Sequence, residues 1–208
     1  MNNGIYEIFR DIWINKFDGD FIGRHGEQIS YEKVKNVRQF RHGAKILRNV
    51  YLKTDDGETT EVDLIVLSKK GIWVFETKNV LGKIYGHEFD RNWRVVVGEK
   101  EHEMYNPIRQ NNGHIEALKD IIGPGYFIVS MVMFSERAQL EDITITSKTV
   151  LCFTRNNLNY LIRHNWRKLR NEISKEEIND LYRTLLPMAN ASRETKMRHR
   201  ASVKRKSG

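Results

Sequence analysis

Two short apolar runs on either side of a tight turn constrain the fold of this chain more than any other feature. The runs are Leu-Ile-Val-Leu at 64–67 and Ile-Trp-Val-Phe at 72–75, and Ser-Lys-Lys-Gly at 68–71 separates them. Aliphatic and aromatic runs around a glycine-containing turn predict a β-hairpin. Because both runs are almost continuously apolar, their strands are expected to be covered on both faces. We therefore predict a hairpin at the centre of an α/β domain.

Charged residues lie where the two runs end, with Asp63 before the first run and Glu76 and Lys78 after the second. If Ser68 pairs with Gly71, Asp63 lies opposite Glu76, and Lys78 shares the face of Glu76 because side chains alternate. Opposed Cβ atoms lie roughly 4.5–5.5 Å apart, and like charges there are destabilising. Two such carboxylates favour a cation between them, and a nearby ammonium suits a phosphate or an attacking water. This is the chemistry of a metal-dependent phosphodiesterase.

The register of this hairpin depends on the length of its turn. A left-handed Gly71 in a bulge would give a three-residue loop instead. The pairing would then slip by one residue and place Asp63 and Glu76 on opposite faces of the sheet. The carboxylate pair therefore requires an even-length loop, or a second bulge that restores the register.

The rest of the chain predicts an α/β fold with a mixed central sheet flanked by helices, in the order helix, three strands, helix, strand. Asn106 and Pro107 indicate a helix start, and Ser174 with Glu177 fits a capping box. A polar β region is expected around residues 84–97. The other strands are expected at 44–52, 60–67, 72–80, 127–134 and 149–153, and the helices from residue 23 and at 107–120, 158–170 and 175–186.

The ends of the chain differ from this core in composition. Residues 1–22 predict an amphipathic segment, because Ile5, Phe9, Ile12 and Trp13 recur at helical spacing. Core packing is its expected role, with dimer or lipid contact as alternatives. Residues 191–208 predict a basic, disordered tail that holds phosphates without reading sequence; the alternative is a solvated end. The basic residues are Arg193, Lys196, Arg198, Arg200, Lys204, Arg205 and Lys206.

Composition narrows the class of protein further. The net charge of +8 favours an anionic partner, with nucleic acid ahead of membrane. The chain has no run of 18 apolar residues, so no membrane span is predicted. Its single cysteine, Cys152, lies in an apolar stretch and is expected to be a buried, inert thiol. These features predict a cytoplasmic protein.

The ordered motifs resemble those of the NERD (nuclease-related) domain of the PD-(D/E)XK nuclease superfamily. The resemblance is strongest over residues 23–120, and the closing helices extend the predicted domain to residue 190. Val62 departs from the proline of the superfamily name. The matching positions are Gly23-x-x-Gly26-Glu27, Thr60-Glu61-Val62-Asp63, Gly71 with the following residues to Asn79, Gly82-x-Ile84-x-Gly86, Trp93, and Asn106-Pro107-x-x-Gln110-Asn111-x-x-His114.

The resemblance implies a restriction-endonuclease-like core and hydrolysis of nucleic acid that depends on Mg²⁺, for which Mn²⁺ can substitute. Asp63 and Glu76 would bind the metal, with the backbone carbonyl of Thr77 as a further hard oxygen ligand. Lys78 would orient or deprotonate the attacking water. The alternative for Lys78 is a salt bridge to Glu76 without catalysis.

Other residues of the motifs have weaker assignments. Glu27 would reach the outer shell of the metal, and Gln110 would bind the phosphate or the water. Their alternatives are an exposed helix glutamate and a helix residue bonded to a loop. His114 lies one turn after Gln110 on the same helix face, and we expect it to pack or hydrogen-bond rather than to act as a base. Glu61 is expected to point away from Asp63 as a bystander.

We therefore predict a metal-dependent nuclease, with DNA favoured over RNA as the substrate. The main alternative is a module on the same fold that binds nucleic acid or protein without catalysis. A third alternative is a structural or membrane-peripheral protein anchored by its N-terminal segment. Cleavage of both strands of a duplex would favour a two-fold homodimer.

Overall fold

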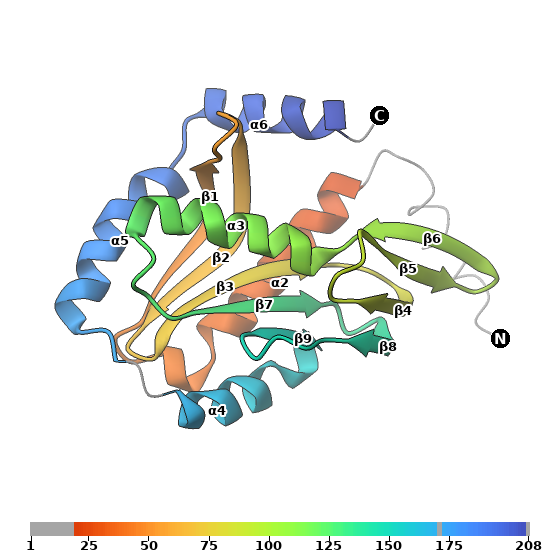
Figure 1. The fold of residues 1–208 in the computed structure, drawn as a ribbon, viewed down its shortest axis with the longest axis horizontal. Coiled ribbons are helices and arrows are strands. Elements are labelled where there is room, and N and C mark those ends of the chain that lie inside the picture. The colour runs from red at the N-terminus through yellow and green to blue at the C-terminus, as the bar shows by residue number, and fades with distance from the viewer. Residues whose placement is uncertain (1–18, 170–171, 207–208) are drawn as a thin grey trace.

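The computed structural model describes residues 19–169 and 172–206 (Figure 1). Most of the amphipathic segment predicted at 1–22, including its four apolar residues, lies outside this range. No helix in the described ranges is both long and apolar enough to cross a membrane. The helices are α2 (Gly19–Lys35), α3 (Pro107–Ile122), α4 (Leu158–Lys168), α5 (Lys175–Ala189) and α6 (Arg193–Lys206).

The strands of the described residues form two mixed sheets, which confirms the predicted α/β class. The first sheet has the order β1-β2-β3-β7-β9 and the second the order β6-β5-β4-β8. The first comprises β1 (Lys45–Lys53), β2 (Thr59–Ser68), β3 (Gly71–Lys78), β7 (Ile128–Phe134) and β9 (Val150–Thr154). The second comprises β4 (Gly82–His87), β5 (Asn92–Val97), β6 (Lys100–Tyr105) and β8 (Ala138–Thr144). Sequence patterns predicted the strands of the first sheet and the region of β4 and β5, but not β6 or β8.

The central hairpin has the register that the carboxylate pair requires. Ser68 pairs with Gly71, so the loop has two residues, and the ladder continues to Leu64 opposite Phe75. Gly71 has φ 120°, and a Cβ there would lie 2.8 Å from the carbonyl oxygen of Phe127. Only glycine fits this turn without strain. The next positions along the hairpin are Asp63 and Glu76.

Strands β1 and β2 change face at one shared position. Residues two apart on a strand normally share a face, yet Val62 and Leu64 belong to different apolar clusters on opposite faces of the sheet. The β1–β2 ladder pairs Arg48 with Leu64 and Val50 with Val62, but it has no pair between them, where Asn49 has φ 47°. This kink at Asn49 and Asp63 bends the far ends of β1 and β2, which form the β1–β2 hairpin, toward α6 (Figure 1).

Helices cover both faces of the first sheet, as expected for nearly continuous apolar strands. On one face, Leu118 of α3 and Leu185 of α5 pack on the inner residues of β1, β2 and β3. On the other face, Val34 of α2 and Ile162 of α4 pack on β3 and β7. The second sheet packs one face on β7 and on Ile108 of α3.

The C-terminal tail differs from the predicted disordered segment, because residues 193–206 form helix α6. His199 docks this helix on the β1–β2 hairpin: its Nδ1 donates to the carbonyl of Thr59 at 2.7 Å. The His199 ring also packs edge-on against Tyr51. Local composition shows the high charge of the tail, whereas docking depends on residues about 140 positions earlier in the chain.

Candidate active site

The candidate site lies at the C-terminal end of β3, beneath the first turns of α3. Asn106 caps α3 by accepting from the backbone amides of Ile108 and Arg109, and Pro107 occupies the first turn. The Asn106 side-chain amide also donates to three carbonyls between the end of β4 and the start of β5, those of residues 87, 88 and 90. This cap fixes where α3 begins, so Gln110 and His114, four residues apart, both face β3.

Glu76 and Lys78 form an ion pair whose members are both bonded to α3. Glu76 Oε1 lies 2.7 Å from Lys78 Nζ, and Glu76 is only 3% exposed. Lys78 Nζ also donates to Gln110 Oε1 at 2.8 Å, and Glu76 Oε2 lies 3.1 Å from His114 Nε2. Burial by itself would raise the pKa of Glu76, but Lys78 and His114 hold it below its ordinary value. Glu76 therefore keeps its negative charge in a buried place.

Asp63 accepts its hydrogen bonds from Thr77, at the C-terminal end of β3. Its Oδ2 accepts from the backbone N–H and from Oγ1 of Thr77, both at 2.7 Å. Burial raises the pKa of Asp63 well above its ordinary value, and the charges of Glu76 and Glu27 raise it further. The two bonds from Thr77 only partly offset this rise. Because the charges of Glu76 and Glu27 both act on Asp63, we treat these three carboxylates as one acidic cluster.

Glu27 reaches this cluster because α2 approaches the end of β3 closely. A Cβ on Gly26 would lie 2.7 Å from the side chain of Asn79, so a larger residue would push the helix away. Arg155 holds the same turn by donating to the Gly26 carbonyl at 3.1 Å. Burial raises the pKa of Glu27, and a hydrogen bond from Asn49 lowers it in part.

Asn49 connects the acidic cluster to the rest of the molecule. Its amide donates to Glu27 Oε2 at 3.3 Å and to Glu61 Oε1 at 2.9 Å. Glu61 Oε2 in turn lies 3.8 Å from Nε2 of His199 on α6. Glu61, expected to be a bystander, therefore links the cluster to α6. The sequence patterns did not predict a role for Asn49. The one feature of the sequence that fits its position is that asparagine tolerates a positive φ better than most residues.

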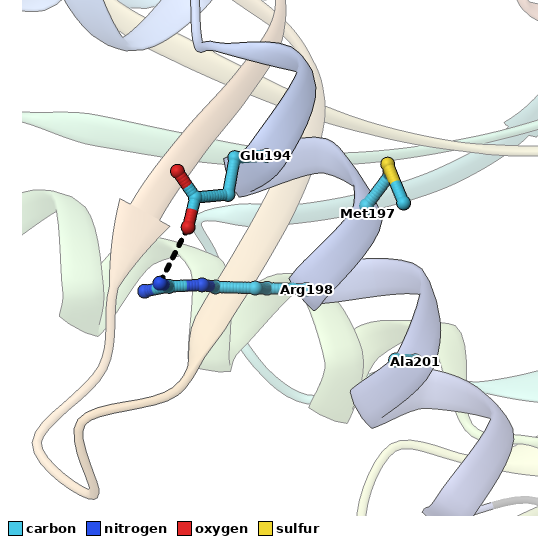
Figure 2. Close-up of a pocket in the computed structure, with 4 residues that line it drawn as sticks. All are labelled: Glu194, Met197, Arg198 and Ala201. Atoms are coloured by element: carbon cyan, nitrogen blue, oxygen red, sulfur yellow. Dashed lines mark hydrogen bonds and ion pairs between the residues drawn. The ribbon is translucent and has the colours of Figure 1, made fainter.

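The basic residues of α6 lie apart from this cluster where their side chains are described. Lys196 Nζ lies 5.8 Å from the ring centre of Tyr51. Arg198 pairs with Glu194 along the helix surface at 2.6 Å, beside the exposed Met197 (Figure 2). The side chains at 193, 200 and 204–206 lie outside the described part of the structure. Phosphate binding by this tail stays a prediction.

The donor set at the strand end suits a hard divalent cation. Asp63 and Glu76 supply carboxylate oxygens and Thr77 a backbone carbonyl, which are the ligands that Mg²⁺ prefers. Burial is the main cause of the raised pKa of Asp63, and the charges of Glu76 and Glu27 add to it; a cation would offset both effects. Each oxygen of Glu76 already accepts one hydrogen bond, so a metal ion would have to use a remaining lone pair or replace Lys78 or His114.

No group of three or more histidine, cysteine, aspartate or glutamate side chains is arranged to hold a metal within the ranges that the structure describes. The predicted ligand set is of another kind, because it combines two carboxylates with a carbonyl. Cys152 takes no part in either arrangement. It is partly buried, and burial raises the pKa of its thiol to about 12, which agrees with an inert cysteine.

The mixed α/β core, with charged residues at the end of its central hairpin, is consistent with a nuclease-like class of protein. A family model described as a nuclease-related domain (NERD) matches residues 22–135, more than half of the chain. The chain therefore belongs to the NERD family, as its motifs predicted. It is also 31% identical over 141 residues to an uncharacterized protein of Bacillus anthracis. That match covers 68% of this chain and 65%, just under two thirds, of the relative.

Proposed function

We propose that this protein hydrolyses phosphodiester bonds of nucleic acid with the help of a divalent metal ion, DNA being favoured over RNA. The observation that carries the proposal is the buried Glu76, paired with the partly exposed Lys78, next to an Asp63 whose pKa is raised. Strongly perturbed carboxylates gathered at one strand end are typical of active sites. Membership of the NERD family supports a nuclease-related function.

The residues have distinct roles in this proposal. Asp63, Glu76 and the carbonyl of Thr77 would hold Mg²⁺, and Mn²⁺ would serve in its place. The bound ion would stabilise charge on the phosphate and lower the pKa of a water ligand. Lys78, held by Gln110, would orient the water or neutralise charge on the phosphate. Glu27 would add negative charge from α2 at the edge of the metal shell.

The direct test is cleavage of circular and linear DNA with Mn²⁺ by the wild type and by Asp63→Asn, Glu76→Gln and Lys78→Met. We expect each substitution to reduce cleavage by roughly two or more orders of magnitude, because each removes a charge from the reacting centre. Lys119→Met is a matched control, since Lys119 forms an exposed ion pair with Glu116 on α3. Undiminished cleavage by all three site variants would contradict the proposed site.

A groove over β4 and β5 supports nucleic acid as the partner. It has a volume of about 830 Å³ and runs over β4 and β5 from Leu81, three residues after Lys78. Lys83, Arg94 and Arg137 line it, and the Arg94 guanidinium lies 4.1 Å from the ring centre of Tyr85. Basic side chains with an aromatic ring suit a phosphate backbone and stacked bases. Two acidic residues, Glu101 and Glu136, also line the groove.

One observation favours the second candidate, a module that binds nucleic acid without cleaving it. Lys78 already neutralises Glu76, which is what a purely structural ion pair would do. A binder would retain DNA in the groove, show no cleavage with Mg²⁺ or Mn²⁺, and keep its DNA affinity when Asp63 or Glu76 is changed. Cytoplasmic location and a homodimer stay predictions under either function.

A further inference from the structure

The imidazole of His114 is bonded on both sides within the core of the site. The residue is 3% exposed and lies on the face of α3 that meets β3. Its Nδ1 lies 2.7 Å from Oγ1 of Thr60 on β2, and its Nε2 lies 3.1 Å from Oε2 of Glu76 on β3. The ring therefore connects the two strands that carry the acidic residues.

The chemistry of these partners sets the direction of the hydrogen bonds. An ionised carboxylate can only accept, so His114 Nε2 must carry a hydrogen and donate to Glu76. In a neutral ring the other nitrogen then accepts, and the Thr60 hydroxyl, which can do either, donates to it. Glu76 thereby sets the tautomer, and the Thr60 hydroxyl, which can adapt to it, holds the ring in place from the other side.

The two oxygens of Glu76 are consequently held in different ways. Oε2 meets a ring whose side chain is 4% exposed and whose far side is bonded to Thr60. Oε1 meets Lys78, a flexible chain that is 20% exposed and has a second partner in Gln110. The hydrogen bond at Oε2 is buried and its donor ring is held on both sides. If the bond at Oε1 is broken, Lys78 still has Gln110 and solvent as partners.

We infer that His114, oriented by Thr60, is a positioning residue that fixes Glu76 Oε2 and leaves Oε1 to change partner between Lys78 and a divalent cation. This inference rests on the proposed metal-dependent function. On exchange, Lys78 keeps its bond to Gln110 and becomes available to the substrate phosphate. The Thr60–His114 pair thus decides which way Glu76 faces, without contacting the substrate.

The first experiment needs neither substrate nor metal. The ¹⁵N signals of the His114 ring, assigned by their absence in His114→Gln, report which nitrogen carries the hydrogen. We expect a hydrogen on Nε2, bonded to Glu76, in the wild type and in Thr60→Ser, which keeps the hydroxyl. Thr60→Val is a near-isosteric change that removes the hydroxyl, and we expect its Nδ1 signal to move toward that of a ring nitrogen without a hydrogen-bond partner. A wild-type ring that carries no hydrogen on Nε2 would overturn the inference.

The second experiment measures binding of Mn²⁺ by calorimetry. Loss of an outer-shell partner of a metal site typically weakens affinity by roughly 10–100-fold. We expect that loss in Thr60→Val and recovery in Thr60→Ser, at matched thermal stability. A Thr60→Val protein that melts earlier yet binds Mn²⁺ as the wild type does would show that Thr60 is merely structural, and the inference would fail.

The third experiment separates this inference from the proposed function. Adding Mg²⁺ to the wild type should shift the ¹⁵N signal of Lys78 Nζ while the His114 ring keeps its Nε2–H bond. If Mg²⁺ instead breaks the His114 bond, exchange occurs at Oε2 and the inference is wrong although metal binding stands. If neither Mg²⁺ nor Mn²⁺ binds, the proposed function fails, and the exchange at Oε1 fails with it.

Discussion

The buried position of Asp63 costs folding stability at neutral pH. Burial raises its pKa, and the charges of Glu76 and Glu27 raise it further. A group whose pKa is raised on folding stabilises the protein below its unfolded pKa, and this contribution is lost as the pH rises through the folded pKa. At neutral pH Asp63 is therefore expected to destabilise the fold, which is common for groups retained for function.

We predict that Asp63→Asn makes the protein more stable at neutral pH, by about 1 kcal/mol, while cleavage is lost. The new amide oxygen can still accept from Thr77, so the local geometry is retained. The gain should vanish below pH 3.8, the ordinary pKa of aspartate, where the wild-type carboxyl is protonated in both states. Urea unfolding across this pH range measures it, with the exposed Asp180→Asn as control. A less stable Asp63→Asn at neutral pH would refute this account of Asp63.

Glu88 is a carboxylate of the opposite kind. It is 4% exposed and accepts hydrogen bonds from the backbone and hydroxyl groups of Thr146 and Ser147. Burial would raise its pKa, but these four donors lower it from 4.5 to about 2. A depressed pKa stabilises the fold above the unfolded pKa, and this contribution is lost as the pH falls through the folded pKa.

We predict that Glu88→Gln destabilises the protein by about 1–3 kcal/mol at neutral pH, because it weakens charge-assisted hydrogen bonds in a buried place. The difference from the wild type should shrink as the pH falls from about 4.5 toward about 2. Thermal melts of both proteins over this range provide the measurement. A constant difference at every pH would mean that shape, and not charge, is what Glu88 contributes.

Among the elements, the second sheet has the clearest separable role. Its inner face, with Trp93 and Ile84, is buried on the first sheet, whereas its outer face lines the groove with Lys83 and Arg94. Core and groove residues thus alternate along the same strands. Outer residues can therefore be changed with little effect on folding.

We predict that Lys83→Ala and Arg94→Ala each weaken DNA binding at all sequences tested, with little change in thermal stability. Each lost phosphate contact should reduce the slope of log affinity against log salt by about one. Fluorescence anisotropy at several salt concentrations measures both quantities. Lys119→Ala, on the exposed side of α3, serves as the control. An unchanged slope in both variants would place the DNA elsewhere.

At the scale of the whole molecule, the family match ends before the first sheet is complete. The match stops at residue 135, just after β7, yet β9 pairs with β7 beyond it. The core on one face of the sheet also needs Ile178, Leu181 and Leu185 of α5. Residues that follow the matched region therefore belong to the same folding unit.

We predict that a chain ending at residue 135 does not unfold cooperatively, because it lacks β9 and the α5 side of the core. A chain ending at residue 192 retains these elements and loses only α6 and the residues after it, so it should keep a cooperative melt. It should also bind DNA more weakly and with a smaller salt dependence, since seven basic residues are removed. Circular dichroism melts and anisotropy test the pair. A cooperative melt of the shorter chain would show that the matched region folds alone.

Features that depend only on residues close together in the sequence were predicted correctly. The two-residue turn, the Asn106 cap with Pro107 and the capping box at Ser174 all follow the expected positions. The strands of the first sheet lie within about two residues of their predicted bounds. Strands β6 and β8 were missed, because β6 is mostly charged and exposed and the apolar alternation of β8 is interrupted between Leu140 and Asp142.

The sequence by itself determined the central hairpin and the set of charged residues at its end, because turn signals and apolar runs act over a few residues, whereas its register was decided in the structure. Tertiary structure alone decided which partners those residues have. His114 meets Thr60 across 54 positions and Arg155 meets Gly26 across 129. Such contacts arise when helices pack on a sheet, and no local propensity encodes which side chains then meet. The kink at Asn49 and the docking of α6 belong to the same class.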